Sequence, residues 1–158
     1  MENDMSVLIP AFVLGVACGL RAMVGLAAVS WAAYSRQLPL EGTWLSFLGS
    51  RVTPYITSLL AVGEMINDKL PKTASRLVPP QFGARVVMGA LTGTAIGISH
   101  GQLVVGILSG VVGSIVGTLA GAKARSLAAG LFGRDLPAAL LEDVLAVALA
   151  VVALVVLR

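Results

Sequence analysis

Charged residues are scarce in this chain of 158 residues, making up 12% of it, about half the share found in typical soluble domains. Hydrophobic residues make up 57%, which excludes a disordered chain and argues against a water-soluble one. Aromatic residues are also few, at 5%, whereas glycine occurs 18 times. Small aliphatic residues in this proportion are typical of helices packed closely within a bilayer. The composition predicts one all-α integral membrane domain over residues 1–158.

Cysteine and histidine occur once each, as Cys18 and His100. One cysteine cannot form an intrachain disulfide, and we interpret Cys18 as a small packing residue. The sequence has no second histidine or cysteine for a zinc site, no phosphate-binding loop and no dinucleotide fingerprint. We therefore expect no metal, no cofactor and no enzymatic activity. The basic residues form no stripe with interleaved aromatics, so nucleic acid is not an expected partner.

Long apolar runs are the main feature that the sequence does contain. A helix needs about 20 apolar residues to cross the roughly 30 Å hydrocarbon layer of a bilayer. The first run is overlong and carries Arg21 near its middle. No basic stretch precedes this run, so we expect it to be retained as a membrane helix rather than removed as a signal peptide. We predict about five spans, with four as the alternative, at residues 7–34, 54–68, 85–99, 102–122 and 137–157.

The segments between these runs predict the membrane boundaries. Residues 35–53 contain a proline, glycines and three charged residues, and we predict an interfacial helix and turn there. Residues 69–84 form a polar connection in which the Pro79–Pro80 pair cannot continue a helix. A basic turn is predicted after the fourth span. Four aromatic residues would form a belt at one boundary: Trp31, Tyr34, Trp44 and Tyr55.

The distribution of Lys and Arg predicts the orientation, because cytoplasmic loops are enriched in these residues. A cytoplasmic N-terminus places most of them inside and leaves Arg36, Arg51 and Arg158 outside. We therefore predict a cytoplasmic N-terminus and an external C-terminus. The bases that would then lie inside are Lys69, Lys72, Arg76, Arg85, Lys123, Arg125 and Arg134.

Glycine recurs at intervals of three or four residues in the third and fourth predicted spans. Such a stripe lets the backbone of a neighbouring helix approach closely, so that dispersion contacts hold the helices together. We predict close helix packing of the glycine-zipper type, most simply within the chain. The glycines expected to form it include Gly89, Gly93, Gly97, Gly113 and Gly117.

An offset of 98 residues aligns part of the first span with the fourth and Arg36–Pro39 with Arg134–Pro137, which share Arg-x-Leu-Pro. It also aligns Gly15 with Gly113 and Gly19 with Gly117. Because these spans lie three helices apart in the predicted order, a true repeat would be inverted in the membrane. Inverted repeats recur in transporters and place the binding site near the midplane.

Arg21 is the most informative residue, because an arginine at bilayer depth costs at least a few kcal/mol unless protein, water or an opposite charge solvates it. Four acids could compensate it, and with Lys69 they would line a path for a solute or ion. Alternatively, these charges pair with one another only to fix the helix register. The predicted partners are Glu64, Asp68, Glu142 and Asp143, whereas lipid headgroups or other anions are the predicted contacts of Arg76, Arg85 and Arg125.

Several short motifs are similar to those of a family of small bacterial polytopic inner-membrane proteins that is classed as a domain of unknown function. The resemblance spans nearly the whole chain, and Glu-x-x-x-Asp-Lys-x-Pro is its most specific part. It implies a location in the bacterial inner membrane and brings no established activity with it. The motifs are Gly19–Met23, Gly63–Pro71, Ser75–Arg76 with Pro79–Pro80, Ala84–Arg85 with Gly89–Leu91, and Leu141–Asp143.

Buried charge of both signs in a glycine-rich bundle favours a small transporter or channel for a small solute or ion. The alternative is a non-transporting scaffold or a lipid-binding module packed through the glycine stripes. The lipid bilayer is the expected partner in either case, and a homodimer is a further arrangement that the glycine stripes would allow.

Overall fold

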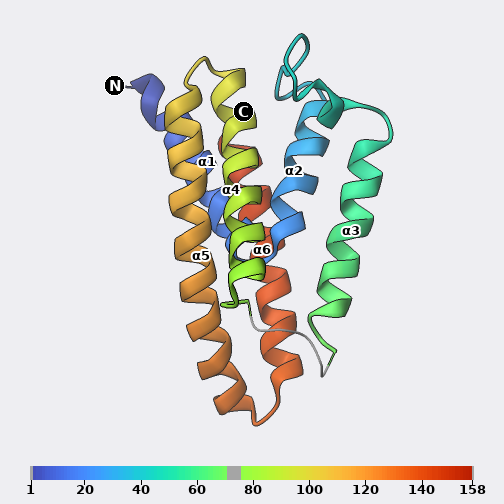
Figure 1. Ribbon diagram of the computed structural model, residues 1–158, viewed down its shortest axis with the longest axis vertical. Coiled ribbons are helices and arrows are strands. Elements are labelled where there is room, and N and C mark those ends of the chain that lie inside the picture. Colours follow the sequence, from blue (N-terminus) through green and yellow to red (C-terminus); the bar gives the residue numbers. More distant parts are fainter. Residues whose placement is uncertain (1, 71–75, 158) are drawn as a thin grey trace.

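The computed structural model describes residues 2–70 and 76–157, which form a helical bundle without a β-strand (Figure 1). The predicted all-α class is confirmed. Three helices, α4, α5 and α6, are long and apolar enough to cross a membrane. The described elements are α1 (Glu2–Leu20), α2 (Ala22–Tyr34), the 3-10 helix η1 (Ser46–Gly49), α3 (Thr53–Asn67), α4 (Pro79–Ser99), α5 (Leu103–Phe132) and α6 (Asp135–Val156).

Large aliphatic side chains cover much of the outside of the bundle. Val104, Leu131 and Val144, for example, have exposed fractions of 67%, 86% and 68%. Apolar surface on this scale is unfavourable in water and suits contact with lipid. Burial and exposure therefore agree with a helical bundle in a membrane.

Residues 7–34 do not form the single overlong span that was predicted, because the chain breaks and reverses at Arg21. Arg21 has extended backbone angles (φ −141°, ψ 108°) between α1 and α2. A Cβ atom on Gly25 would lie 3.3 Å from the carbonyl oxygen of Leu14. Eleven residues of straight helix would instead separate these positions by about 16 Å along the axis. The two helices form a hairpin that enters the bundle and returns to the same end (Figure 1).

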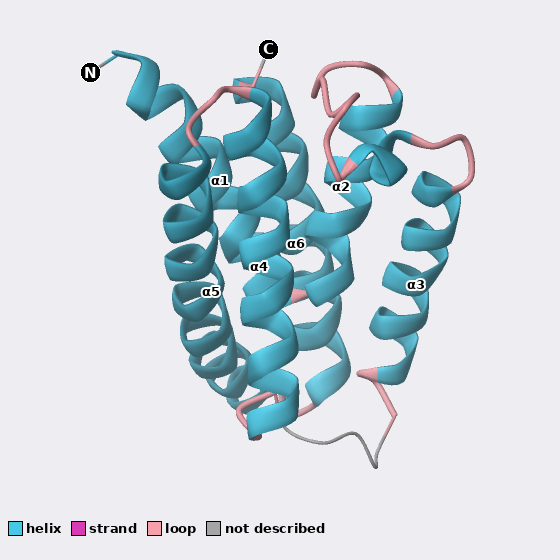
Figure 2. Ribbon diagram, turned by 45° about the horizontal axis from the view of Figure 1, so that its top comes forward, coloured by secondary structure: helices cyan, strands magenta, loops and turns pink. Residues whose placement is uncertain are grey.

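The reversal changes the predicted arrangement of the termini. The start of α1 and the end of α6 lie at the same end of the bundle (Figure 2), whereas the sequence predicted opposite sides. The prediction was wrong because the hairpin adds one change of direction. The connections that follow α3 and α5 lie at the other end. Residues 71–75 of the first connection, Lys72 among them, lie outside the described residues.

Two helices extend beyond their predicted bounds, while α3 and α6 lie within two residues of theirs. Helix α4 begins at Pro79 because proline fits the first turn of a helix, where its missing N–H is not needed. Helix α5 continues ten residues past 122, so Lys123 and Arg125 lie on a helix and not in the predicted basic turn. It ends before Gly133, whose φ of 65° favours glycine.

Residues 35–52 fold back onto the bundle through turns and η1, with Leu45 and Leu48 fully buried. The interfacial helix predicted there is therefore a single short 3-10 helix. Trp31 packs edge-on against Tyr55 with ring centroids 5.2 Å apart, which joins α2 to α3 at this end. Trp44 is 66% exposed, as expected of an aromatic residue at a boundary.

Helix α5 packs through glycine against two neighbours. A Cβ atom on Gly93 would lie 3.1 Å from Cα of Gly110, and one on Gly113 would lie 3.1 Å from Cα of Gly15. Either substitution would therefore require the backbones to move apart. The glycines named from the sequence all lie at such contacts: Gly89, Gly93 and Gly97 face α5 from α4, whereas Gly113 and Gly117 face α1 from α5.

The same contacts give the direction of each pair. Successive residues of α1 meet successive residues of α5, so these two helices are parallel, whereas α4 and α5 are antiparallel. The segments that align at an offset of 98 residues therefore run the same way through the bundle. The prediction that they form an inverted pair is wrong, because the reversal at Arg21 makes four changes of direction between α1 and α5 instead of three.

The glycine contacts yield a stability prediction. Gly110→Ala places a methyl group against the backbone of α4, and we expect the free energy of unfolding to fall by about 1–3 kcal/mol. Gly130→Ala is the matched control, because a Cβ atom there meets nothing within 4 Å. Thermal unfolding in detergent would measure both variants. Equal melting temperatures for Gly110→Ala and the wild-type protein would contradict the packing argument.

Candidate functional site

The break between α1 and α2 is capped by charged side chains from two other helices. From α4, Arg85 donates hydrogen bonds to the carbonyl oxygens of Gly19 at 2.9 Å and Leu20 at 2.5 Å. From α3, Glu64 accepts hydrogen bonds from the backbone amides of Ala22 at 2.9 Å and Met23 at 2.8 Å. A cation thus lies at the C-terminus of one helix and an anion at the N-terminus of the next, as their dipoles favour.

Arg21 lies in the break itself, and its side chain is fully buried. Its Nε donates to Asp143 at 2.6 Å and its Nη1 to Asp68 at 2.5 Å, while Nη2 lies 3.6 Å from Glu142. Three of the four acids predicted as its partners thus surround it. Glu64 binds the backbone next to Arg21 instead. One guanidinium consequently joins the helix break to α6 and to the end of α3.

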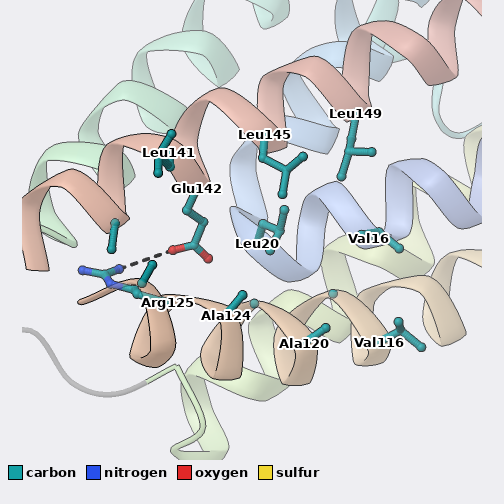
Figure 3. Close-up of a pocket in the computed structure, with 14 residues that line it drawn as sticks. Val16, Leu20, Val116, Ala120, Ala124, Arg125, Leu141, Glu142, Leu145 and Leu149 are labelled. Atoms are coloured by element: carbon teal, nitrogen blue, oxygen red, sulfur yellow. Dashed lines mark ion pairs between the residues drawn. The ribbon is translucent and has the colours of Figure 1, made fainter. Parts of the chain in front are cut away.

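Further bases hold these acids from the other side. Arg76 pairs with both carboxylate oxygens of Glu142, at 2.6 Å for the Nη2–Oε2 bond. Lys69 pairs with Asp143 and donates to the carbonyl oxygen of Met65 at 2.9 Å. Arg125 pairs with Asp68 and lies 3.5 Å from Glu142, as the close-up in Figure 3 shows for the second pair. Each acid of the cluster therefore has more than one donor.

The bases predicted to reach lipid headgroups lie in this cluster. Arg76 and Arg85 are only 7% and 3% exposed, and their guanidinium groups bind Glu142 and the end of α1. Both residues thus bind groups of the protein itself, and their contact with lipid headgroups or other anions stays a prediction. Arg125 is more accessible, with a side chain 15% exposed, but it is held by Asp68 and Asp135.

Two contributors were missed from the sequence. Asp135 binds Arg125 at 2.9 Å and 2.6 Å across the connection from α5 to α6, and its position in a predicted basic turn hid it. Gly121 leaves room for the Arg76–Glu142 pair, because a Cβ atom there would lie 3.1 Å from the Arg76 Nη1 and 3.3 Å from the Glu142 Oε1. The regular spacing of the glycines includes Gly121, but the spacing does not reveal that this glycine makes room for an ion pair.

The cluster has two unsatisfied donors and balanced charges. Among the described residues, Nη2 of Arg21 and Nε of Arg85 are buried without a hydrogen-bond partner. Five bases face five acids when Asp135 is counted, which is 58% exposed but binds Arg125. In the described part of the chain, no three acids, histidines or cysteines gather as metal ligands would. The two free donors both belong to arginine, and such groups can bind an anion but not a cation.

Three hollows lie along the bundle, and two of them reach the cluster. One of about 250 Å³ lies along α1, α5 and α6 and ends at Arg125 and Glu142 (Figure 3). A second, of about 400 Å³, lies between α3 and α6 and is lined by Met65, Asp143 and Val147. A third, of about 360 Å³, continues from Met65 and Val147 toward Trp31. The second and third share lining residues, so they form a groove on the α3 side that reaches an acid of the cluster.

These features define a helical membrane protein with a buried charge cluster at a broken helix. The family known as Domain of unknown function (DUF4126) matches residues 8–156, and the chain belongs to it. No curated protein matches the chain, and no solved structure does.

The ion pairs of Arg21 yield a second prediction. Arg21→Leu leaves Asp68 and Asp143 buried without their central partner, and we expect a loss of about 3–5 kcal/mol in the free energy of unfolding. Combining it with Asp143→Asn should recover part of this loss, because one uncompensated charge is removed. Unfolding in detergent measures both, with the exposed Arg51→Ala as control. Additive losses in the double variant would contradict the pairing.

Proposed function

We propose that this protein is a small transporter or channel of the bacterial inner membrane, with the charge cluster around Arg21 as its site for a small solute or ion. The observation that carries the proposal is the broken helix, whose two ends meet within the bundle and are capped by Arg85 and Glu64. Transporters use discontinuous helices in this way, because backbone groups freed at the break can bind a solute.

The free-energy cost of burying these charges also supports a functional role for the cluster. Buried ion pairs stabilise a protein little compared with apolar packing of the same volume, since both charges lose their hydration. A bundle needing only stability would not require five bases and four acids inside it. Charged side chains within membrane segments usually mark solute paths or relays. The proposed path residues are Arg21, Glu64, Asp68, Lys69, Glu142 and Asp143.

The groove on the α3 side supports a route to the cluster. Helix α3 packs mainly against α2 and η1, and the hollows lined by Met65 and Val147 separate it from α6. Lys69 and Glu64 are also partly accessible, with side chains 21% and 19% exposed. A solute entering beside α3 would meet Asp143 first and Arg21 behind it.

A lipid-binding module is the second candidate, and the hollow along α5 and α6 favours it. Its walls are aliphatic, and Arg125 lies at one end, so it matches an acyl chain with an anionic headgroup. A scaffold that docks through Gly89, Gly93 or Gly113 is less well supported, because these glycines already contact helices of the same chain. Ordered lipid bound against Arg125, without solute flux, would favour the lipid-binding function.

The orientation follows from the same proposal. The connections after α3 and α5, together with the adjoining ends of α4 and α5, carry most of the bases, so we assign this end to the cytoplasm and both termini to the opposite side. Ser46→Cys and Ser126→Cys are exposed positions at the two ends, and Cys18 is buried. In intact cells, a membrane-impermeant maleimide should label Ser46→Cys and not Ser126→Cys. The reverse pattern would contradict the assignment.

Flux through reconstituted vesicles tests the function. We expect wild-type vesicles to pass at least one salt or neutral solute of a panel faster than protein-free vesicles, as measured by light scattering after an osmotic step. Arg21→Ala and Glu64→Gln should slow this flux tenfold or more, since each removes a charge of the site, whereas Arg51→Ala should not. If the Arg21→Ala and Glu64→Gln proteins fold and pass the solute as fast as the wild-type protein, the proposed solute path is refuted.

A further inference from the structure

The carboxylate of Glu64 occupies a position that suits a carboxylate from outside the protein. Its two oxygens accept one hydrogen bond each from the consecutive amides of Ala22 and Met23. Two parallel donors match a planar, two-oxygen group better than a spherical ion such as chloride. The side chain is 19% exposed, so this position can be reached from outside the cluster.

Arg85 adds an independent observation that points to a ligand at this position. It is 3% exposed, and its Nη1 is used by the end of α1. Its Nη2 is directed to Glu64 at the long distance of 3.5 Å, and Nε, on the same edge of the guanidinium plane, has no hydrogen-bond partner among the described residues. This edge is the part of arginine that binds a carboxylate through two hydrogen bonds.

We propose that the solute is a small carboxylate, which binds to the amides of Ala22 and Met23 and to the Nε–Nη2 edge of Arg85 in exchange for Glu64. The proposal rests on the transport function proposed above and names its substrate class. Glu64 acts as a built-in competitor that holds the helix break when no solute is present. Exchange of one carboxylate for another leaves the charge of the cluster unchanged, which favours a monoanion over a dianion or a cation.

Rescue of a shortened side chain tests the binding position without any flux measurement. Glu64→Ala removes the internal carboxylate and leaves both amides and the Arg85 edge free. Sodium formate should raise the melting temperature of the purified variant in detergent by roughly 3–5 °C over sodium chloride at equal ionic strength, if formate is present at about ten times its dissociation constant.

Three controls restrict this result to the proposed site. Glu64→Gln should not respond to formate, because its side chain still fills the position, and the exposed Glu41→Ala should not respond either. Glu64→Ala combined with Arg85→Lys keeps the charge but loses the two-donor edge, and the formate effect should fall at least threefold. No rescue of Glu64→Ala, or equal rescue by formate, chloride and phosphate, would overturn the carboxylate site.

Flux separates this inference from the function on which it rests. Wild-type vesicles should take up labelled formate, acetate or lactate faster than protein-free vesicles, and Glu64→Gln should slow that uptake. Flux of other solutes with no rescue by formate would overturn the substrate class and leave transport standing. Rescue by formate without flux of any solute would refute transport and, with it, the assignment of the carboxylate as a substrate.

Discussion

The structure depends on how the backbone is satisfied at the break between α1 and α2. A helix that ends inside a membrane bundle leaves carbonyl oxygens and amides without partners, and no water is available to bind them. Arg85 supplies donors to Gly19 and Leu20, and Glu64 supplies acceptors to Ala22 and Met23. Because these side chains come from α4 and α3, the hairpin cannot be stable until both helices are in place.

The charged residues that cap the break, Glu64 and Arg85, are surrounded by further charged residues. Glu64 and Arg85 alone would leave Arg21 buried and uncompensated in the break, so Asp68 and Asp143 bind it, and Lys69 and Arg125 in turn hold these acids. Thr118 binds the carbonyl oxygen of Gly19, which places the break level with the middle of α5. The glycines at this level keep α1 close enough for that bond, so glycine packing and the charge cluster support each other.

The sequence was sufficient to predict a membrane bundle and the acids around Arg21, because low charge content and the cost of buried arginine are local properties. The reversal at Arg21 was not predictable in this way. No proline marks it, the nearby Gly19 belongs to the packing against α5, and the residues that stabilise it, Glu64 and Arg85, lie more than 40 residues away. The length of α5 was missed for a related reason. A base such as Arg125 usually marks the end of a membrane span, but here Asp68 and Asp135 pair with it and the helix continues past it.

The two sides of the cluster differ in rigidity. On one side, α1, α4 and α5 are locked backbone to backbone, so Arg85 and the ends of the broken helix have fixed positions. On the other side, α3 and the two residues after it contribute Glu64, Asp68 and Lys69, but α3 packs mainly on α2 and η1, next to the hollows along α6. A displacement of α3 would therefore withdraw two acids and one base together and expose Arg21 and Arg85. The amides of α2 would remain in place, because α2 is held by α4 and α6 as well.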